Sequence, residues 1–206
     1  MVKVETLRVG SMAANCYILF DSDSNAVIID PGDDAELIIN RLRDFNLTPK
    51  AILATHGHFD HIMASLELKL AFNIPLYMSE KDNFLLERMR ETAIHFLGTD
   101  PGPAAQIDFS LKDKMNLLVG EITLKVIATP GHTPGSVCFV EKSSKSVFVG
   151  DLVFSDGSVG ETSHKYSDER DLKKSLRTIL KLPGDYTLFS GHGEPVAMHL
   201  LQENLF

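Results

Sequence analysis

The sequence predicts an α/β fold, in the broad sense that includes α+β proteins, and three observations support this prediction. The length of 206 residues fits one compact domain with a sizeable core. Hydrophobic residues make up 44% of the chain and charged residues 23%, which is typical of a globular protein. Short apolar runs of strand length alternate with segments whose apolar residues recur at helical spacing. We therefore expect a single domain over residues 1–206.

The first third of the chain has the pattern of a β-hairpin region followed by a helix and a buried strand. Three strands are expected, at residues 2–9, 15–20 and 26–30. Asp33 and Asp34 precede apolar residues at helical spacing up to Phe45, which predicts a helix start. Pro49 ends the connection, and residues 50–54 form a short apolar strand of the kind that is buried on both faces.

Helices and strands continue to alternate in the rest of the chain. Helical spacing marks residues 62–72 and 82–96, with a strand at 74–78 between them and a loop at 98–103. Further strands are expected at residues 117–118, 122–128, 136–140, 146–149 and 186–189. The last helices are expected at 172–182 and 197–206. Because both halves place strands before a helix, we expect a duplicated sandwich.

The charge and hydropathy of the chain argue against two classes of partner. There are 28 acidic and 20 basic residues, and no basic cluster is dense enough to neutralise a row of phosphates, so we expect no nucleic-acid partner. No apolar run is long enough to cross a bilayer, and residues 1–8 lack the apolar core of a signal peptide. We therefore expect a cytoplasmic protein without a membrane partner, acting on a small molecule.

The two cysteines are expected to be structural. Cys16 and Cys138 both lie in apolar runs that have the pattern of strands. A small buried hydrophobe is the common role of cysteine in such a position. We expect two buried free thiols and no disulfide.

A cluster of metal-ligand side chains follows the strand expected at 50–54. His56, His58, Asp60 and His61 lie within six residues. Imidazole nitrogens together with a carboxylate oxygen suit a borderline divalent ion such as zinc. The chain has only eight histidines and three of them are here, so a polar loop rich in histidine by chance is the weaker interpretation.

Three later positions repeat this pattern at the ends of apolar strands. His132 lies between two Pro-Gly corners, Asp151 follows a strand ending at Gly150, and His192 follows the last expected strand. Each alone is weak evidence, because a strand-end aspartate is often a turn residue and a lone loop histidine is usually solvated. Since all four groups follow strands, we expect one edge of the sheets to gather them.

Together these residues resemble the metal signature of the metallo-β-lactamase-fold hydrolases, and the layout of the chain is similar to the glyoxalase II (hydroxyacylglutathione hydrolase) group. The signature, His-x-His-x-Asp-His followed by His, Asp and His, is matched at His56, His58, Asp60, His61, His132, Asp151 and His192. This resemblance implies a four-layer αββα sandwich with the site at the edge of its two sheets. It implies that one metal ion is bound by His56, His58 and His132. It implies that the other is bound by Asp60, His61 and His192, with Asp151 as a bridge.

The implied chemistry is hydrolysis by a metal-bound hydroxide. Two divalent ions, with Zn²⁺ preferred and Fe or Mn as alternatives, make such a nucleophile available near neutral pH. In this interpretation Asp60 also orients the hydroxide or handles its proton, which makes Asp60 and Asp151 the catalytic candidates. A thioester is a chemically easy substrate, because a thiolate with a pKa near 8.5 departs without protonation.

Other activities of the same superfamily remain alternatives at this stage. Lactonase activity is one. A persulfide dioxygenase, with a single iron on His56, His132 and Asp151, is another. Lactam hydrolysis is disfavoured because class B β-lactamases lack the bridging aspartate. A purely structural metal site is disfavoured because the expected open edge leaves positions free for water.

Recognition of glutathione is open to question. Where the glyoxalase II group, by resemblance, carries arginine, this chain has Glu161. Thirteen residues follow Gly193, so we expect the helical domain that holds glutathione in full-length members of that group to be absent. Lys165 and Tyr166 are nearby and could compensate, although a solvated loop is the simpler interpretation of this segment.

Context assigns a role to three further residues and leaves a fourth open. Asp30, in Asp-Pro-Gly, is expected to accept a hydrogen bond from a ligand histidine. His95 and His199 lie in expected helices and are not expected to bind metal, whereas His164, in the loop after Asp151, is left open.

Overall fold

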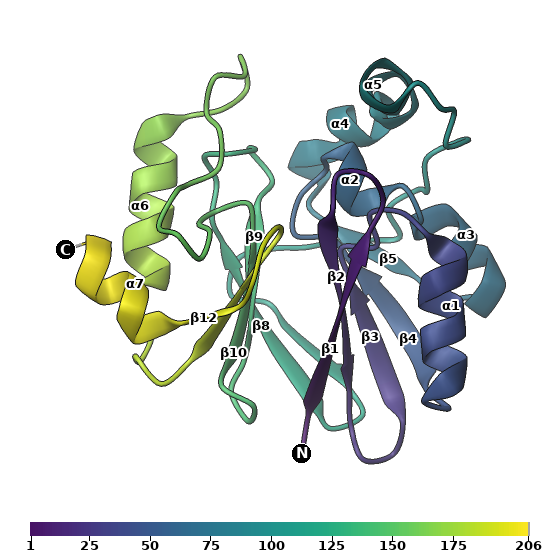
Figure 1. Ribbon diagram of the computed structural model, residues 1–206, viewed down its shortest axis with the longest axis horizontal. Coiled ribbons are helices and arrows are strands. Elements are labelled where there is room, and N and C mark those ends of the chain that lie inside the picture. Colours follow the sequence, from purple (N-terminus) through teal and green to yellow (C-terminus); the bar gives the residue numbers. More distant parts are fainter. Residues whose placement is uncertain (206) are drawn as a thin grey trace.

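Two six-stranded mixed sheets pack face to face in the centre of the molecule, and helices cover both outer faces (Figure 1). The computed structural model describes residues 1–205, so Phe206 of the expected terminal helix lies outside the described residues. Helices α1 and α3 lie outside the first sheet, and α6 and α7 lie outside the second (Figure 1). The expected αββα sandwich is confirmed.

The first half of the chain builds the first sheet, in the order β1-β2-β3-β4-β5-β6. Its strands are β1 (Lys3–Val9), β2 (Ala14–Phe20), β3 (Asn25–Ile29), β4 (Thr48–Leu53), β5 (Leu76–Met78) and β6 (Phe109–Ser110). Its helices are α1 (Ala35–Asp44), α2 (Phe59–Ile62), α3 (Ser65–Phe72), the 3₁₀ helix η1 (Glu80–Asp82), α4 (Asn83–Glu87) and α5 (Met89–Leu97). The pairs from β3 to β6 are parallel, so the carboxyl ends of these strands meet at one edge.

The second half builds the second sheet, in the order β12-β11-β10-β9-β8-β7. Its strands are β7 (Asn116–Val119), β8 (Ile122–Ala128), β9 (Val137–Glu141), β10 (Ser146–Gly150), β11 (Thr187–Ser190) and β12 (Val196–Ala197), and its helices are α6 (Glu169–Ile179) and α7 (Met198–Leu205). Strands β10 and β11 are parallel, which again brings two carboxyl ends together.

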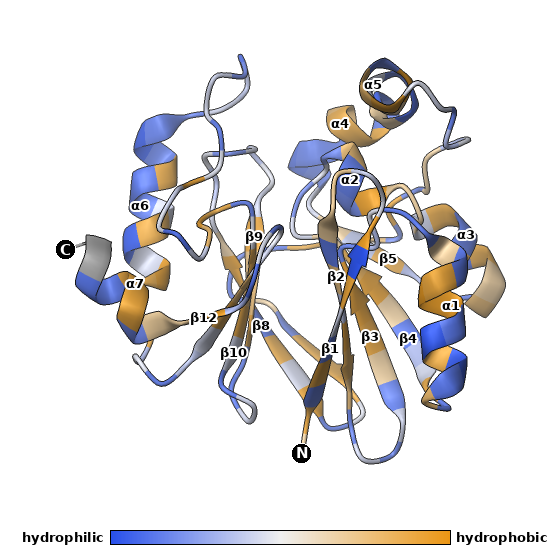
Figure 2. Ribbon diagram, viewed as in Figure 1, coloured by the Kyte–Doolittle hydropathy of each residue, from blue (hydrophilic) through white to orange (hydrophobic). Residues whose placement is uncertain are grey.

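Apolar side chains fill three layers that hold this architecture together. Between the sheets, Tyr17 packs on Phe148 at a ring-centroid distance of 5.1 Å, and Phe148 stacks on Phe189 at 5.0 Å. The outer layers bury the apolar faces of the helices, whose polar faces point outward (Figure 2). Cys16 and Cys138 are buried free thiols in the strands, as expected. The site described below therefore rests on a rigid, apolar frame.

Several element boundaries differ from the sequence predictions. Strand β4 begins at Thr48 and includes Pro49, which was expected to lie in the connection. Proline is tolerated there because the ladder shifts register between Ala26 and Val27, at the point where Pro49 pairs. The helix expected at 82–96 is divided at Arg88 into α4 and α5. The two-residue strands β6 and β12 were not predicted, since pairs this short have no periodicity.

The sequence was also expected to contain no segment that crosses a bilayer. Within residues 1–205, the structure has no helix that is both long enough and apolar enough to span a membrane.

Candidate metal centre

The metal-ligand side chains identified in the sequence lie together at one edge of the sandwich. Each follows the carboxyl end of a strand or lies on the helix next to it. His56 and His58 follow β4, Asp60 and His61 lie on α2, and His132, Asp151 and His192 follow β8, β10 and β11. The structure therefore brings all seven residues to a single edge, although Asp60 and His61 lie on a helix and not in the loop that the sequence indicated.

The first group of side chains consists of three histidines whose ring nitrogens face one another. His58 Nδ1 lies 2.9 Å from His132 Nε2 and 3.2 Å from His56 Nε2. One ligand atom from each of these residues and from Asp151 lies within 4.8 Å of the others. Three imidazole nitrogens directed at one point form the kind of donor set that binds a divalent transition metal.

The second group consists of Asp60, His61 and His192, whose ligand atoms also lie within 4.8 Å of one another. His192 Nε2 is 3.3 Å from Asp60 Oδ2, and His61 Nε2 is 3.8 Å from the same oxygen. This group has one carboxylate and two imidazoles, so its ligand atoms form a harder Lewis-base set than the three imidazoles of the first group.

Asp151 lies between the two groups. Its Oδ2 is 3.6 Å from His132 Nε2 and 3.9 Å from His192 Nε2, and its Oδ1 is 3.5 Å from His61 Nε2. A single carboxylate thus approaches histidines of both groups, which is the position that a bridging ligand needs.

Outer hydrogen-bond partners orient three of the rings. His132 Nδ1 donates to the carbonyl oxygen of Glu161 at 2.8 Å, and His58 Nε2 lies 2.9 Å from the Tyr166 hydroxyl, within hydrogen-bond distance. His56 Nδ1 lies 3.1 Å from Thr55 Oγ1. With a proton on each of these outer nitrogens, the inner nitrogens carry free lone pairs, as metal ligation requires.

Asp30 performs the same task for His61, as its sequence context predicted. Asp30 Oδ2 accepts from His61 Nδ1 at 3.2 Å and from Thr55 Oγ1 at 2.6 Å, while Oδ1 accepts from the Thr55 amide at 2.7 Å. Thr55 therefore links the carboxylate under His61 to the ring of His56.

Two buried atoms of the cluster test whether divalent metal ions fit these residues. Among the described residues, His61 Nε2 and Asp151 Oδ1 have no hydrogen-bond partner, although both atoms are buried. An unpartnered buried polar atom is unfavourable, and both atoms point toward other ligand-type atoms. The residues present fit divalent metal ions at both groups.

The pKa values separate the histidines by their surroundings. Burial, reinforced by neighbouring histidines, lowers the pKa of His56 well below its usual range and that of His58 to about 3. Burial also opposes protonation of His61, but the nearby carboxylates, first Asp151 and then Asp60, raise its pKa to about 10. His56 and His58 are therefore neutral at pH 7, the form in which imidazole binds metal.

Asp82 is a residue of the site that the sequence analysis did not identify. Its buried carboxylate accepts from the Gly57 amide at 3.0 Å, from Thr133 Oγ1 at 2.6 Å and from the Gly135 amide at 2.6 Å. It thus connects the loop of His56 and His58 to the loop of His132. In the sequence it was interpreted only as the first residue of a helix, and the sequence contained no signal for its contacts.

Gly191 allows the close approach of two ligand residues. A Cβ atom at this position would lie 2.1 Å from Asp151 Oδ1 and 2.6 Å from His61 Cε1. Both distances are far below van der Waals contact, so any side chain here displaces these ligands.

A pocket of about 400 Å³ opens beside the cluster and shares His58 and Asp60 with it. Its other lining residues come from the β1–β2 turn, the loop after β4, α2, the α4–α5 segment and the loop after Asp151. The apolar ones include Met12, Leu85, Met89 and Phe96, and the polar ones are Arg88, Thr92, Glu161, His164 and Tyr166. A concave, apolar wall beside a reactive centre is the usual form of a substrate site.

The remaining histidines lie outside the two groups. His164 stacks on Tyr166 with ring centroids 5.0 Å apart, and its ring lies 5.7 Å from that of His58. His95 packs against Phe96, and His199 lies near the carbonyl of Gly184. None of the three belongs to a ligand group within the described part of the chain.

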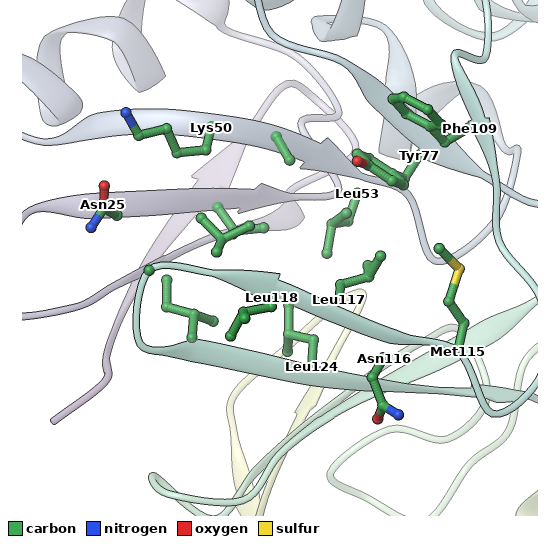
Figure 3. A pocket seen from close by; sticks show the side chains of 15 residues that line it. Asn25, Lys50, Leu53, Tyr77, Phe109, Met115, Asn116, Leu117, Leu118 and Leu124 are labelled. Atoms are coloured by element: carbon green, nitrogen blue, oxygen red, sulfur yellow. The ribbon is translucent and has the colours of Figure 1, made fainter.

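A larger cavity of about 600 Å³ lies between strands β3 and β4 and the β7–β8 hairpin (Figure 3). Its walls are mainly apolar, with Leu53, Leu117 and Leu124 facing the cavity and Tyr77 stacked on Phe109 at one end. It contains no histidine, cysteine or carboxylate among its lining residues, so the metal chemistry belongs to the smaller pocket.

Comparisons with known proteins agree with this architecture. A family model described as the metallo-beta-lactamase superfamily matches residues 9–192. Hydroxyacylglutathione hydrolase GloC of Haemophilus influenzae is 36% identical over 200 residues, which cover 93% of this chain and 91% of that protein. The probable metallo-hydrolase YqgX of Bacillus subtilis is 34% identical over 194 residues, covering 93% and 90%.

Two solved structures are similar over nearly their whole length. The crystal structure of BLEG-1 B3 metallo-beta-lactamase has a TM-score of 0.89 and 36% identity, covering 100% of this chain and 97% of that one. The crystal structure of TTHA1623 in a di-iron-bound form has a TM-score of 0.87 and 34% identity, and covers 96% of each chain.

Proposed function

Because this chain belongs to the metallo-beta-lactamase superfamily, we propose that it hydrolyses thioesters of the hydroxyacylglutathione type with two divalent metal ions. The coarser statement, that the chain is a metallohydrolase of this superfamily, follows from the family match and its relatives. The observation that carries the finer proposal is the apolar pocket, which shares His58 and Asp60 with the metal-ligand cluster. The similarity to a hydroxyacylglutathione hydrolase supports it.

The ligand assignment that we propose follows the two groups of side chains. One ion is bound by His56, His58 and His132. The other is bound by Asp60, His61 and His192. Asp151 is shared between them, since its carboxylate approaches histidines of both groups. When bound, such ions lower the pKa of water from about 15.7 to near 7 and polarise the carbonyl group that is attacked. Zinc is our first choice and iron or manganese the alternatives.

The protein itself contributes orientation. Thr55, Tyr166, Asp30 and the Glu161 carbonyl hold the rings of the ligand histidines, so the inner nitrogens are directed before any ligand arrives. Asp60 lies at the edge of the pocket, where its carboxylate accepts a proton from, or orients, the attacking water.

The pocket favours a thioester over an ester or amide. A thiolate with a pKa near 8.5 leaves without being protonated, so no general acid is needed at the sulfur. The apolar side chains of Leu85, Met89 and Phe96 offer a dry wall for the carbon chain on either side of the sulfur.

Hydrolysis of S-lactoylglutathione by metal-loaded protein tests the proposal. We expect turnover that is lost on chelation and restored by Zn²⁺, Mn²⁺ or Fe²⁺. His58→Ala and Asp151→Ala should each reduce kcat/KM by more than the ~10- to 100-fold that loss of an outer hydrogen-bond partner costs. His95→Ala, outside both ligand groups, is the matched control and should leave turnover unchanged. Normal rates in either ligand variant would contradict the assignment.

A second candidate, lactam hydrolysis, is favoured by one comparison. BLEG-1, which is 36% identical and matches the whole chain, is named a B3 metallo-beta-lactamase. The carboxylate at Asp151, which class B β-lactamases lack, argued against this activity in the sequence. Measuring kcat/KM for a chromogenic cephalosporin beside that for the thioester decides between the two. A higher value for the cephalosporin would make the lactam the better assignment.

A further inference from the structure

Arg88 brings a positive charge into the pocket beside the metal-ligand cluster. It is the residue that divides α4 from α5, and it is one of the residues that line the pocket. Arg8, Arg41 and Arg90 are each paired with a carboxylate. Among the described residues, the Arg88 guanidinium has no such pair.

Glu161 brings a negative charge into the same pocket. It lies in the loop between β10 and α6, and its backbone carbonyl accepts from His132 Nδ1. Its side chain accepts from the Ser163 hydroxyl and has no cationic partner in the described part of the chain. The pocket therefore contains one arginine and one glutamate. They are far apart in the sequence and lie on separate segments, the α4–α5 junction and the loop between β10 and α6.

From these two charges we infer that the pocket selects a thioester whose thiol half is a zwitterion, with a carboxylate bound by Arg88 and an ammonium bound by Glu161. The inference rests on the proposed thioester hydrolysis and names the substrate class of that site.

Charge balance argues for a zwitterion over a simple anion. The chain has a formal net charge of −8, which repels anions at long range. A substrate with only a carboxylate would gain the Arg88 contact but would meet Glu161 without compensation. A substrate with only an ammonium would gain the contact with Glu161 but would be repelled by Arg88. A zwitterion satisfies both side chains, and charge-assisted hydrogen bonds of this kind are the strong ones in a binding site.

The test compares one acyl group on three thiols: glutathione, which carries an ammonium and carboxylates, 3-mercaptopropionate, which carries only a carboxylate, and N-acetylcysteamine, which is neutral. We expect the lowest KM for glutathione. Arg88→Ala should raise the KM for the glutathione and mercaptopropionate thioesters about tenfold and leave the neutral thioester unchanged. Glu161→Gln should raise the KM for glutathione and lower it for mercaptopropionate. This change of sign is one that general damage to the fold would not produce.

Arg90→Ala and Glu169→Gln are the matched controls, since Arg90 and Glu169 pair with Asp100 and Lys173 outside the pocket. Equal KM values for the three thioesters, or an unchanged KM in Arg88→Ala, would overturn the inference. Calorimetric binding of the corresponding S-butyl thioethers, which cannot be hydrolysed, keeps the test independent of turnover. A protein that binds the zwitterionic thioether best but hydrolyses no thioester would refute the proposed function and leave the charge preference standing.

Discussion

Asp30 Oδ2 lies 3.2 Å from His61 Nδ1, and both side chains are almost fully buried. The same carboxylate accepts two hydrogen bonds from Thr55. Because Asp30 holds Nδ1 of His61, the other ring nitrogen, Nε2, faces Asp60 and Asp151. The contact therefore determines which nitrogen of a candidate ligand is free to bind metal.

Asp30→Asn should lower metal affinity by about 10- to 100-fold, because the asparagine amide offers His61 a donor in place of an acceptor. Asp30→Ala should lose a similar affinity and also destabilise the fold, since it leaves the donors of Thr55 unpaired. Competition with a chromophoric chelator measures affinity, and urea denaturation measures stability. An asparagine variant with the affinity of the natural chain would show that the contact does not act on the metal centre.

Asp82→Ala should reduce the free energy of unfolding by about 2–4 kcal/mol, because it leaves the amides of Gly57 and Gly135 and the hydroxyl of Thr133 without their acceptor. It should also weaken metal binding, since it frees the loops of His58 and His132 from each other. The control is Asp100→Ala, which removes an exposed ion pair with Arg90 and should leave the denaturation midpoint unchanged. Equal midpoints for the two variants would refute the role given to Asp82.

Gly191→Ala should abolish metal binding while the fold persists. The added methyl group would lie 2.1 Å from Asp151 Oδ1, so the carboxylate must move away from the histidines that it approaches. Gly184→Ala is the control, because its nearest neighbour is the flexible end of Gln202 at 3.1 Å. Metal analysis and circular dichroism of both variants make the comparison. A full metal complement in Gly191→Ala would show that the close packing around Asp151 is not needed.

Asp21 should contribute stability that is lost in acid. Its carboxylate accepts from the amides of Asn25 and Glu121 at 2.9 Å each, joining the β2–β3 turn to the β7–β8 turn. Burial acts to raise its pKa, but these hydrogen bonds outweigh it and hold the pKa below the ordinary value of 3.8. The unfolded chain thus binds the proton more readily, so the contribution is complete above pH ~4 and fades as the pH falls through the folded-state pKa.

Urea denaturation of the natural chain and of Asp21→Asn across pH 6 to 3 measures this effect. The natural chain should be the more stable at pH 6, and the difference should shrink toward pH 3. A stability difference between the two proteins that stays constant from pH 6 to 3 would show that the Asp21 carboxylate does not cause the loss of stability in acid.

The sequence predicted the parts of the site that depend on strand ends. His56, Asp151 and His192 each follow an apolar run, and parallel strands bring such ends together, so their convergence could be anticipated. Asp30 could be anticipated because Asp-Pro-Gly marks a fixed corner close to a strand end. In these cases a local sequence pattern is enough to predict which residues lie close together in the folded protein.

Other features depend on contacts that no local pattern encodes. Asp82 is 25 residues from Gly57 and 53 from Gly135, and its carboxylate joins loops that become neighbours only after folding. The division of the helix at Arg88 involves neither Gly nor Pro, so apolar spacing continued across it in the sequence. Pro49 was assigned to the connection because proline weakens most strands, and only the register shift beside Ala26 shows why it is tolerated.

The central claim, a dinuclear centre that hydrolyses thioesters, is tested most directly by metal analysis of the purified protein combined with thioesterase assays before and after chelation. We predict close to two equivalents of zinc, iron or manganese per chain, and loss of S-lactoylglutathione hydrolysis when they are removed. Full thioesterase activity in metal-free protein would contradict the account, as would one equivalent of iron with oxygen consumption on a persulfide.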